Sequence, residues 1–504
     1  MGVDILFKSA IGNVMNRPLP ILFFVLSFVH SLHGASPNVL FVAVDDLRPE
    51  LGCYGSRALT PNIDKLAASG LQFTHAYCNQ AVCGASRVSL MTGLYPEFTR
   101  ERTYHVTGWR EKWAGVVTLN QHFKANGYTT IGLGKIYHGS SGRGVDPDNW
   151  TEWVKVSGKE YANPESFEAQ KQAQANRPPR KRGKHRGPAT EASRASDDFH
   201  FDGQRAKEGA SRLKELANAG KPFFLAVGFT KPHLPFIAPE KYWNLYNRVD
   251  FKMPGTGVPP GYPDYARNAF AGEIHAYSDV PLKEPPTKFA QELNQRLIHG
   301  YHASVSYTDR NIGMLLDALE SSGAADNTIV VLWADHGWKL GDHGSWCKHT
   351  NFEVDTRVPL ILRHPDMCSA RGIAAAPTEL IDLYPTLCEL CGIDVPQHVQ
   401  GRSFLPVLEN PEVSHRESAY SSYPHSGHGE RLVGHSIRIS QYRYTEWWSE
   451  KTDKVYESVL TDLEADPLEV TSVQGRDGLK AKFSRILNER VHSARNTKGL
   501  TRLP

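Results

Sequence analysis

Short apolar runs alternate with longer amphipathic stretches over most of the chain. The runs that we expect to form strands are residues 38–44, 128–133, 222–229, 328–334 and 358–362, and the expected helices cover about 119–126, 203–219 and 289–321. Apolar runs that do not alternate with polar residues are typical of strands buried on both faces of a parallel sheet. With helices between them, these runs predict an α/β fold, a large and mostly parallel sheet flanked by helices.

The pattern changes near residue 409. The segments that alternate like antiparallel strands with one exposed face are residues 417–422, 436–439 and 442–448. An amphipathic helix is expected at 479–491. We therefore expect a large domain over residues 36–408 and a smaller C-terminal antiparallel α+β subdomain over residues 409–504.

Residues 155–198 lack a sustained apolar period and are rich in Lys, Arg, Gln, Pro and Ala. We expect a long surface loop or insertion here. Its basic run at 177–187 (RPPRKRGKHRG) is either a solvated segment or a binding site for a polyanionic substrate.

The N-terminal 35 residues have the composition of a targeting signal. The apolar run at 18–29 is preceded by Lys8 and Arg17 and followed by Gly34 and Ala35, which predicts a signal peptide over residues 1–35. The run is short for a membrane span, so we expect no stable membrane insertion, and a retained anchor is the alternative. Export predicts a periplasmic or secreted protein in a bacterium, or a lysosomal one in an animal.

Composition narrows the classes of function. The chain has 504 residues, of which 40% are hydrophobic and 22% are charged, as in an ordinary globular protein. Its net charge of +3 argues against bulk binding of nucleic acid. Seven cysteines in a chain of this length do not form a dense disulfide framework.

Polar side chains follow the expected strands. They are Asp45 and Asp46, Lys135 and His138, His233, Asp335 and His336, and the nearby Lys348. Because the carboxyl ends of parallel strands meet at one edge of a sheet, we expect these residues to share a site there, although each alone is more often an ordinary surface residue. The adjacent carboxylates of Asp45 and Asp46 favour a hard divalent cation, and a solvated turn is the alternative.

Cys83 lies in the run QAVCGASRVSLMTG at residues 80–93. Small residues follow the thiol, residues 87–91 favour a helix and Gly93 is a stop, which places Cys83 at a helix N-terminus. Free N–H groups and the helix dipole favour an anion there, and Arg87 lies one turn further on. The run therefore predicts a nucleophile in an oxyanion-binding site. A buried, unreactive thiol is the alternative.

This run resembles the signature of the type I sulfatases, Cys-x-Pro-Ser-Arg followed by a helix that ends in Thr-Gly. Ala85 stands where most members carry proline. The resemblance covers nearly the whole mature chain, through segments such as VDDLRPELGCYG, GYTTIGLGKIYH, PFFLAVGFTKPHLPF and DHGWKLGDHG. It implies an alkaline phosphatase/sulfatase-like fold, with residues 36–408 as the catalytic domain. His336, where many members carry Asn, points to the branch that acts on uronic acid 2-O-sulfates.

The resemblance also implies roles for individual residues. Cys83 is expected to be oxidised to formylglycine by a formylglycine-generating enzyme, and one Ca²⁺, with Mg²⁺ as the alternative, is expected on Asp45, Asp46, Cys83, Asp335 and His336. The residues expected to contact sulfate or transfer protons are Arg87, Lys135, His138, His233 and Lys348. Trp338 and Lys348 are similar to residues that meet the carboxylate of the sugar. The expected substrate is a sulfated carbohydrate, first of all iduronate 2-O-sulfate of glycosaminoglycan-like chains.

Two other functions remain open at this point. The same fold and cations suit a phosphatase or phosphonate-type hydrolase, for which a second metal is expected and His343 is a spare ligand. A non-catalytic protein that binds sulfated polysaccharide is expected if Cys83 is not oxidised.

Overall fold

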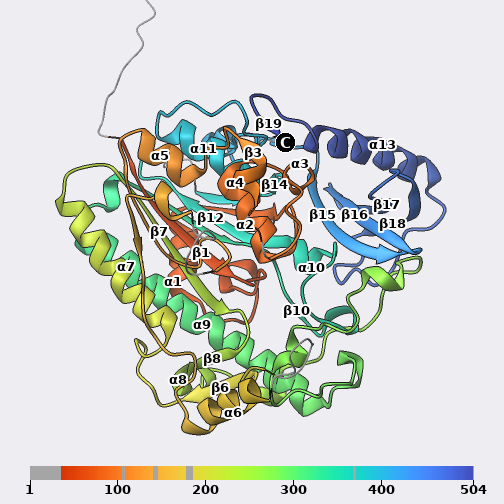
Figure 1. Cartoon of the computed structure of the whole chain (residues 1–504), viewed down its shortest axis with the longest axis horizontal. Helices are drawn as coiled ribbons and strands as arrows, with labels where there is room; N and C mark the ends of the chain where they lie inside the picture. Colours follow the sequence, from red (N-terminus) through yellow and green to blue (C-terminus); the bar gives the residue numbers. More distant parts are fainter. Residues whose placement is uncertain are drawn as a thin grey trace, which may run out of the picture. The chain divides into compact units, whose positions relative to one another are not determined.

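The computed structural model describes residues 36–104, 106, 108–139, 146–176, 185–366 and 371–502 (Figure 1). The predicted signal peptide and most of the basic run at 177–187 lie outside the described residues. Residues Ser36–Pro504 form one compact unit. No helix in the described ranges is long and apolar enough to cross a membrane.

A mixed sheet lies at the centre of this unit. In spatial order its strands are β13 (Gly372–Ala374), β2 (Leu71–Tyr77), β12 (Arg357–Arg363), β9 (Thr328–Ala334), β1 (Asn38–Asp45), β7 (Phe223–Pro232), β4 (Thr129–Gly134) and β5 (Glu152–Val154), with β14 (Thr378–Glu379) also paired to β2. All neighbours are parallel except the pairs that β12 makes with β2 and β9. The mostly parallel sheet predicted from the apolar runs is confirmed.

Helices cover both faces of the sheet (Figure 1). Helices α7 (Phe201–Asn218) and α9 (Gln291–Ser321) pack against each other and on β7, with α1 (Pro61–Ser69) against α9. On the other face lie α2 (Cys83–Thr92), α5 (Leu119–Ala125) and α11 (Leu383–Leu390). Every residue of β1 is buried, which explains its unbroken apolar sequence.

The C-terminal part contains an antiparallel sheet of β15 (Ala419–Gly427), β16 (Glu430–Ile439), β17 (Tyr442–Ser449) and β18 (Val455–Asp462). Helix α13 (Asp477–Ala494) packs its buried Phe483, Leu487 and Val491 on this sheet. Backbone bonding from Ser422 to Asn79 ties the sheet to the larger one. A domain boundary at residue 408 stays a prediction.

Of the two alternatives for residues 155–198, a long surface loop or an insertion, the loop is wrong. Helix α6 (Pro164–Ala175) forms there, and β6 (Thr190–Ser193) pairs in parallel with β8 (Phe236–Pro239). The helix starts with proline at its first position and consists mostly of good helix formers, while it buries only Ser166 and Ala173. Intrinsic propensity therefore specifies this helix, and a search for apolar periodicity does not detect it.

The remaining α-helices and strands of the described residues are short. They are α3 (Pro96–Thr99), α4 (Trp109–Lys112), β3 (Trp113–Ala114), α8 (Glu240–Trp243), β10 (Lys339–Leu340), β11 (Trp346–Cys347), α10 (Glu353–Thr356), α12 (Leu405–Glu409) and β19 (Thr501–Arg502).

Candidate active site

Helix α2 begins at Cys83, as the sequence predicts. All ten of its residues are buried, and Gly93 ends it with a φ of 69°. A Cβ at Gly84 would lie 2.4 Å from the backbone oxygen of Tyr104, so only glycine fits directly after the thiol. Cys83 is therefore a buried residue at a helix start, where the N–H groups of the first turn have no partner within the helix.

Asp45 and Asp46 lie at the carboxyl end of β1, between β7 and β9, and both are fully buried. Asp46 has a φ of 58°, a conformation that is uncommon for a residue other than glycine. Strained conformations of this kind cluster at functional sites, where the surroundings hold them in place. Asp45 pairs with Arg87 of α2, and Asp46 lies 3.4 Å from Nε2 of His336, which follows β9.

Four side chains converge on one point. One ligand atom each from Asp45, Asp46, Cys83 and His336 lies within 4.8 Å of all the others. The Nδ1 atom of His336 lies 2.9 Å from the carbonyl oxygen of Gly337, and its Nε2 lies 3.2 Å from the Cys83 sulfur. If Nδ1 donates to that carbonyl, Nε2 keeps a free lone pair facing the other three residues, which is the arrangement of a metal-ligating histidine.

The electrostatics of the two carboxylates fit a cation. Burial raises the pKa of Asp46 to about 7, although Lys348 opposes this. Burial acts in the same direction on Asp45, but Lys135, His233 and Arg87 outweigh it and hold its pKa well below the ordinary value. A hard divalent ion prefers oxygen ligands and offsets the cost of burying two negative charges, so this donor set suits such an ion.

Asp335 lies beside the four converging residues and is not one of them. One carboxylate oxygen accepts hydrogen bonds from the backbone N–H groups of Asp46 and His336, at 3.1 and 3.0 Å. The other accepts from Nε of Arg87 at 2.8 Å. In this arrangement Asp335 orients the two candidate ligands and neutralises Arg87.

Three cations surround the point of convergence. Arg87 is fully buried and also donates to Asp45 at 3.1 Å, while Lys135 bonds Asp45 and lies 4.0 Å from the Cys83 sulfur. The ammonium of Lys348 lies 3.0 Å from both carboxylate oxygens of Asp46. The predicted cations therefore meet at one site, as the strand order requires.

The two predicted histidines have different positions. Nε2 of His233 lies 3.7 Å from Asp46, and burial lowers the pKa of this imidazole. His138 is half-buried, with its ring 5.7 Å from that of Tyr104. Burial, reinforced by the charge of Lys135, lowers the pKa of His138 to about 3. Both are therefore neutral near pH 7 and can accept a proton.

Trp338 is fully buried, and the Lys348 ammonium lies 4.6 Å from the centre of its indole ring. This cation–π contact positions Lys348. His343, considered as a ligand for a second metal, instead stacks on Phe352, with ring centroids 3.7 Å apart, and is not part of the converging group.

Glu273 is the site residue that the sequence does not reveal. One carboxylate oxygen lies 2.9 Å from Nε2 of His233 and the other 3.0 Å from Nζ of Lys348. Burial opposes its ionisation, but Lys348 and His233 hold its pKa well below the ordinary value. It lies in a Pro- and Gly-rich tract without a strong pattern, so only the fold brings it to the site.

The thiol itself is a poor nucleophile here. Burial, reinforced by the charge of Asp45, raises the pKa of Cys83 well above its ordinary value. Since the thiolate is the reactive form of cysteine, an unmodified Cys83 does not fit nucleophilic catalysis at neutral pH.

Comparison with known proteins identifies the family. Residues 37–393 match the sulfatase family. The chain belongs to it. Residues 341–497 also match the C-terminal region of the N-sulphoglucosamine sulphohydrolases. As a member of the sulfatase family, the protein is a sulfuric ester hydrolase, and its fold is the one that the sequence resemblance implies.

Individual relatives agree with this assignment. Iduronate 2-sulfatase of Homo sapiens is 32% identical over 86% of this chain and 90% of its own, and that of Mus musculus is 32% identical over 81% and 84%. Among solved structures, the phosphonate monoester hydrolase of Agrobacterium radiobacter has a TM-score of 0.71 at 21% identity, covering 93% of this chain and all of that chain (100%). A structure in complex with its substrate D-glucosamine-2-N,6-O-disulfate has a TM-score of 0.69 at 22% identity, covering 91% of this chain and 98% of its own. These two structures share the fold with this sulfatase.

Proposed function

We propose that this sulfatase removes the 2-O-sulfate of a uronic acid, with iduronate first, from the end of a glycosaminoglycan-like chain. The observation that carries the proposal is the position of Cys83 at the start of α2, with His336 3.2 Å from its sulfur and Asp45 and Asp46 in the same group. The similarity to iduronate 2-sulfatases over most of the chain favours the uronate.

In this proposal Cys83 is oxidised to formylglycine by a formylglycine-generating enzyme during maturation. The hydrated aldehyde supplies one hydroxyl for attack on sulfur and a second for the release of sulfate. The high pKa of the buried thiol supports this, because the unmodified side chain remains protonated.

A single calcium ion fits the carboxylates of Asp45 and Asp46, Nε2 of His336 and the oxidised Cys83, with Asp335 beside them. When bound, it supplies positive charge against the sulfate oxygens and the nucleophile. The chain itself supplies fixed charge through Arg87, Lys135 and Lys348, which lowers the energy of the developing negative charge.

In this proposal the two neutral histidines transfer the proton. His233 and His138 are each able to take a proton from the nucleophile and return it to the departing alkoxide. The proposed partner for the sugar carboxylate is Lys348, which Trp338 holds in place through the cation–π contact.

A panel of defined sulfated oligosaccharides tests the substrate. We expect release of sulfate from uronate 2-O-sulfates, and mass spectrometry of the Cys83 peptide is expected to find the aldehyde. Hydrolysis only of neutral 6-O-sulfated sugars would refute the role of Lys348 while leaving a sulfatase. Turnover of phosphonate monoesters by a protein with two metal ions would instead favour the phosphonate hydrolase alternative.

A further inference from the structure

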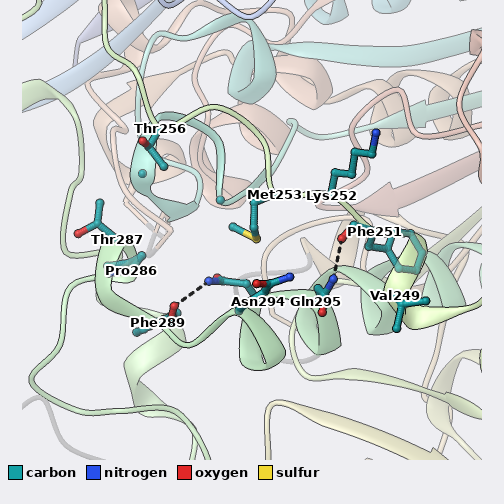
Figure 2. Close-up of a pocket in the computed structure, with 13 residues that line it drawn as sticks. Val249, Phe251, Lys252, Met253, Thr256, Pro286, Thr287, Phe289, Asn294 and Gln295 are labelled. Atoms are coloured by element: carbon teal, nitrogen blue, oxygen red, sulfur yellow. Dashed lines mark hydrogen bonds between the residues drawn. The ribbon is translucent and has the colours of Figure 1, made fainter.

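A cavity of about 530 Å³ lies beside the loop that connects His336 to Lys348 (Figure 2). Three segments line it: residues 249–256, residues 286–295 at the start of α9, and the turn that contains Gly341 and Gly344. Its volume is in the range of pockets that bind small molecules. None of the residues assigned above to metal, sulfate or proton transfer lines it.

The turn leaves the cavity open because it carries no side chains there. Gly341 has a φ of 104°, and a Cβ on it would lie 2.7 Å from the end of Met253. Gly344 has a φ of 66°, and its Cβ would lie 2.6 Å from the methyl group of Thr287. Any other residue at either position would be strained and would crowd the wall opposite.

The start of helix α9 forms the base of the cavity. Figure 2 shows the amide groups of Gln295 and Asn294 bonded to the backbone oxygens of Phe251 and Phe289, each at 3.1 Å. The oxygen of the Asn294 side chain also accepts a hydrogen bond from the indole of Trp346 at 3.1 Å. Trp346 precedes Lys348 by two residues, so the base is bonded directly to the loop that carries this cation.

The rim of the cavity consists of exposed polar side chains. Lys252, Thr256, Thr287 and Gln291 are exposed, and their side chains make no hydrogen bond or ion pair within the described part of the chain. Among the described residues that line the cavity, Lys252 is the only charged one, and none carries a carboxylate. The rim therefore offers hydroxyl and amide groups and one positive charge to a ligand.

The walls complete this chemistry with apolar surface. Phe251, Phe289 and Pro286 line the cavity, and Met253, which is 36% exposed, points toward α9 (Figure 2). A sulfated sugar ring presents the matching groups, which are C–H faces, hydroxyls and an anion. A neutral apolar ligand would offer no partner for the positive charge of Lys252, and a cation would be repelled by that charge.

We infer that this cavity is a second sugar subsite, which binds a sulfated residue of the polysaccharide chain other than the one that is hydrolysed. This inference rests on the proposed function, because it takes the same polymer as ligand. Binding at two places on one chain raises the affinity for long substrates without changing the chemical step.

The test compares a long with a short substrate. The kinetics of the wild type and of Lys252→Glu are measured with two substrates. They are a heparin decasaccharide and a heparin disaccharide that carry the same 2-O-sulfated uronate at the end. We expect KM for the decasaccharide to rise roughly fivefold, the range of one exposed charge contact, with kcat unchanged and the disaccharide unaffected. The difference is expected to shrink in 0.5 M salt, at a Debye length of about 4 Å.

Two further variants test the cavity itself and control for the change of charge. Thr287→Phe fills the cavity from an exposed position and is expected to raise KM for the decasaccharide alone. Lys283→Glu makes the same charge change on an exposed residue outside the lining and is expected to leave KM unchanged for both substrates. Equal melting temperatures check that all variants fold.

A binding measurement distinguishes failure of the subsite from failure of the proposed function. If the wild type hydrolyses neither oligosaccharide, the proposed substrate is wrong, and titration calorimetry with the decasaccharide still tests the cavity. Weaker binding by Lys252→Glu than by Lys283→Glu supports the subsite in either case. The same affinity in both variants, or an equal change for the decasaccharide and the disaccharide, overturns it.

Discussion

The carboxylate of Glu273 lies 2.9 Å from Nε2 of His233. Its second oxygen reaches Lys348, so one side chain links a candidate proton carrier to a candidate sulfate-binding cation. Glu273 is also 20% exposed, at the edge of an otherwise buried group. It therefore fixes the positions of His233 and Lys348 relative to each other.

Replacing Glu273 tests this positioning role. Glu273→Gln keeps the shape but removes the charge, and a hydrogen bond to a charged group contributes about 1.5 kcal/mol, so kcat/KM is expected to fall about tenfold. Glu273→Asp, which restores the charge, is expected to recover part of the loss. The control is Glu284→Gln, an exposed residue in the same tract. Unchanged kinetics in Glu273→Gln would rule the role out.

Replacing Cys83 tests the nucleophile. Cys83→Ser and Cys83→Ala are expected to abolish turnover, because alanine has no group to oxidise and an unoxidised serine lacks the second hydroxyl that expels sulfate. Both residues are small and fit the helix start, so circular dichroism and the melting temperature are expected to stay close to those of the wild type. Full activity in Cys83→Ser would contradict the assignment.

Removal of metal tests the cluster of Asp45, Asp46 and His336. Chelation is expected to lower activity and to reduce the melting temperature by roughly 3 °C, since ligand binding stabilises only the folded state. Added calcium is expected to restore both. Elemental analysis is expected to find one calcium per chain, and two zinc ions would instead indicate the phosphatase branch.

A buried ion pair far along the chain allows a prediction about stability. Asp382 is fully buried and accepts hydrogen bonds from Nε of Arg416 at 2.7 Å and from Nε2 of His415 at 3.0 Å. Removing one partner of such a pair leaves an uncompensated charge, so Asp382→Asn is expected to lower the free energy of unfolding by about 3 kcal/mol. Urea denaturation measures it, with the exposed Asp326→Asn as control.

The same pair predicts a dependence on pH. Burial opposes ionisation of Asp382, but Arg416 outweighs it and keeps the pKa of the folded state below its ordinary value. The stabilisation is therefore present above the unfolded pKa of about 4 and is lost as pH falls toward the folded value. Between pH 5 and 3 the wild type is expected to lose more stability than Asp382→Asn. Parallel losses in both proteins would contradict this.

The sequence by itself predicts those features that depend on local pattern and strand order. An unbroken apolar run such as residues 38–44 has few alternatives to a central buried strand, and the carboxyl ends of parallel strands must share an edge. The sequence therefore predicts that Asp45, Asp46, Lys135, His233 and His336 lie together. The start of α2 at Cys83 follows from the small residues after it and the glycine at its end.

Only the tertiary structure decides what depends on contacts between distant segments. Glu273 is bonded to His233 and Lys348 across tens of residues, and no periodicity in its tract marks it. The carboxylate of Asp335 accepts a hydrogen bond from Arg87, 248 positions away, and is not among the four converging side chains. The cavity beside the 336–348 loop needs three separate segments to meet. Loop positions are set by packing against the finished sheet, which the order of residue types alone does not encode.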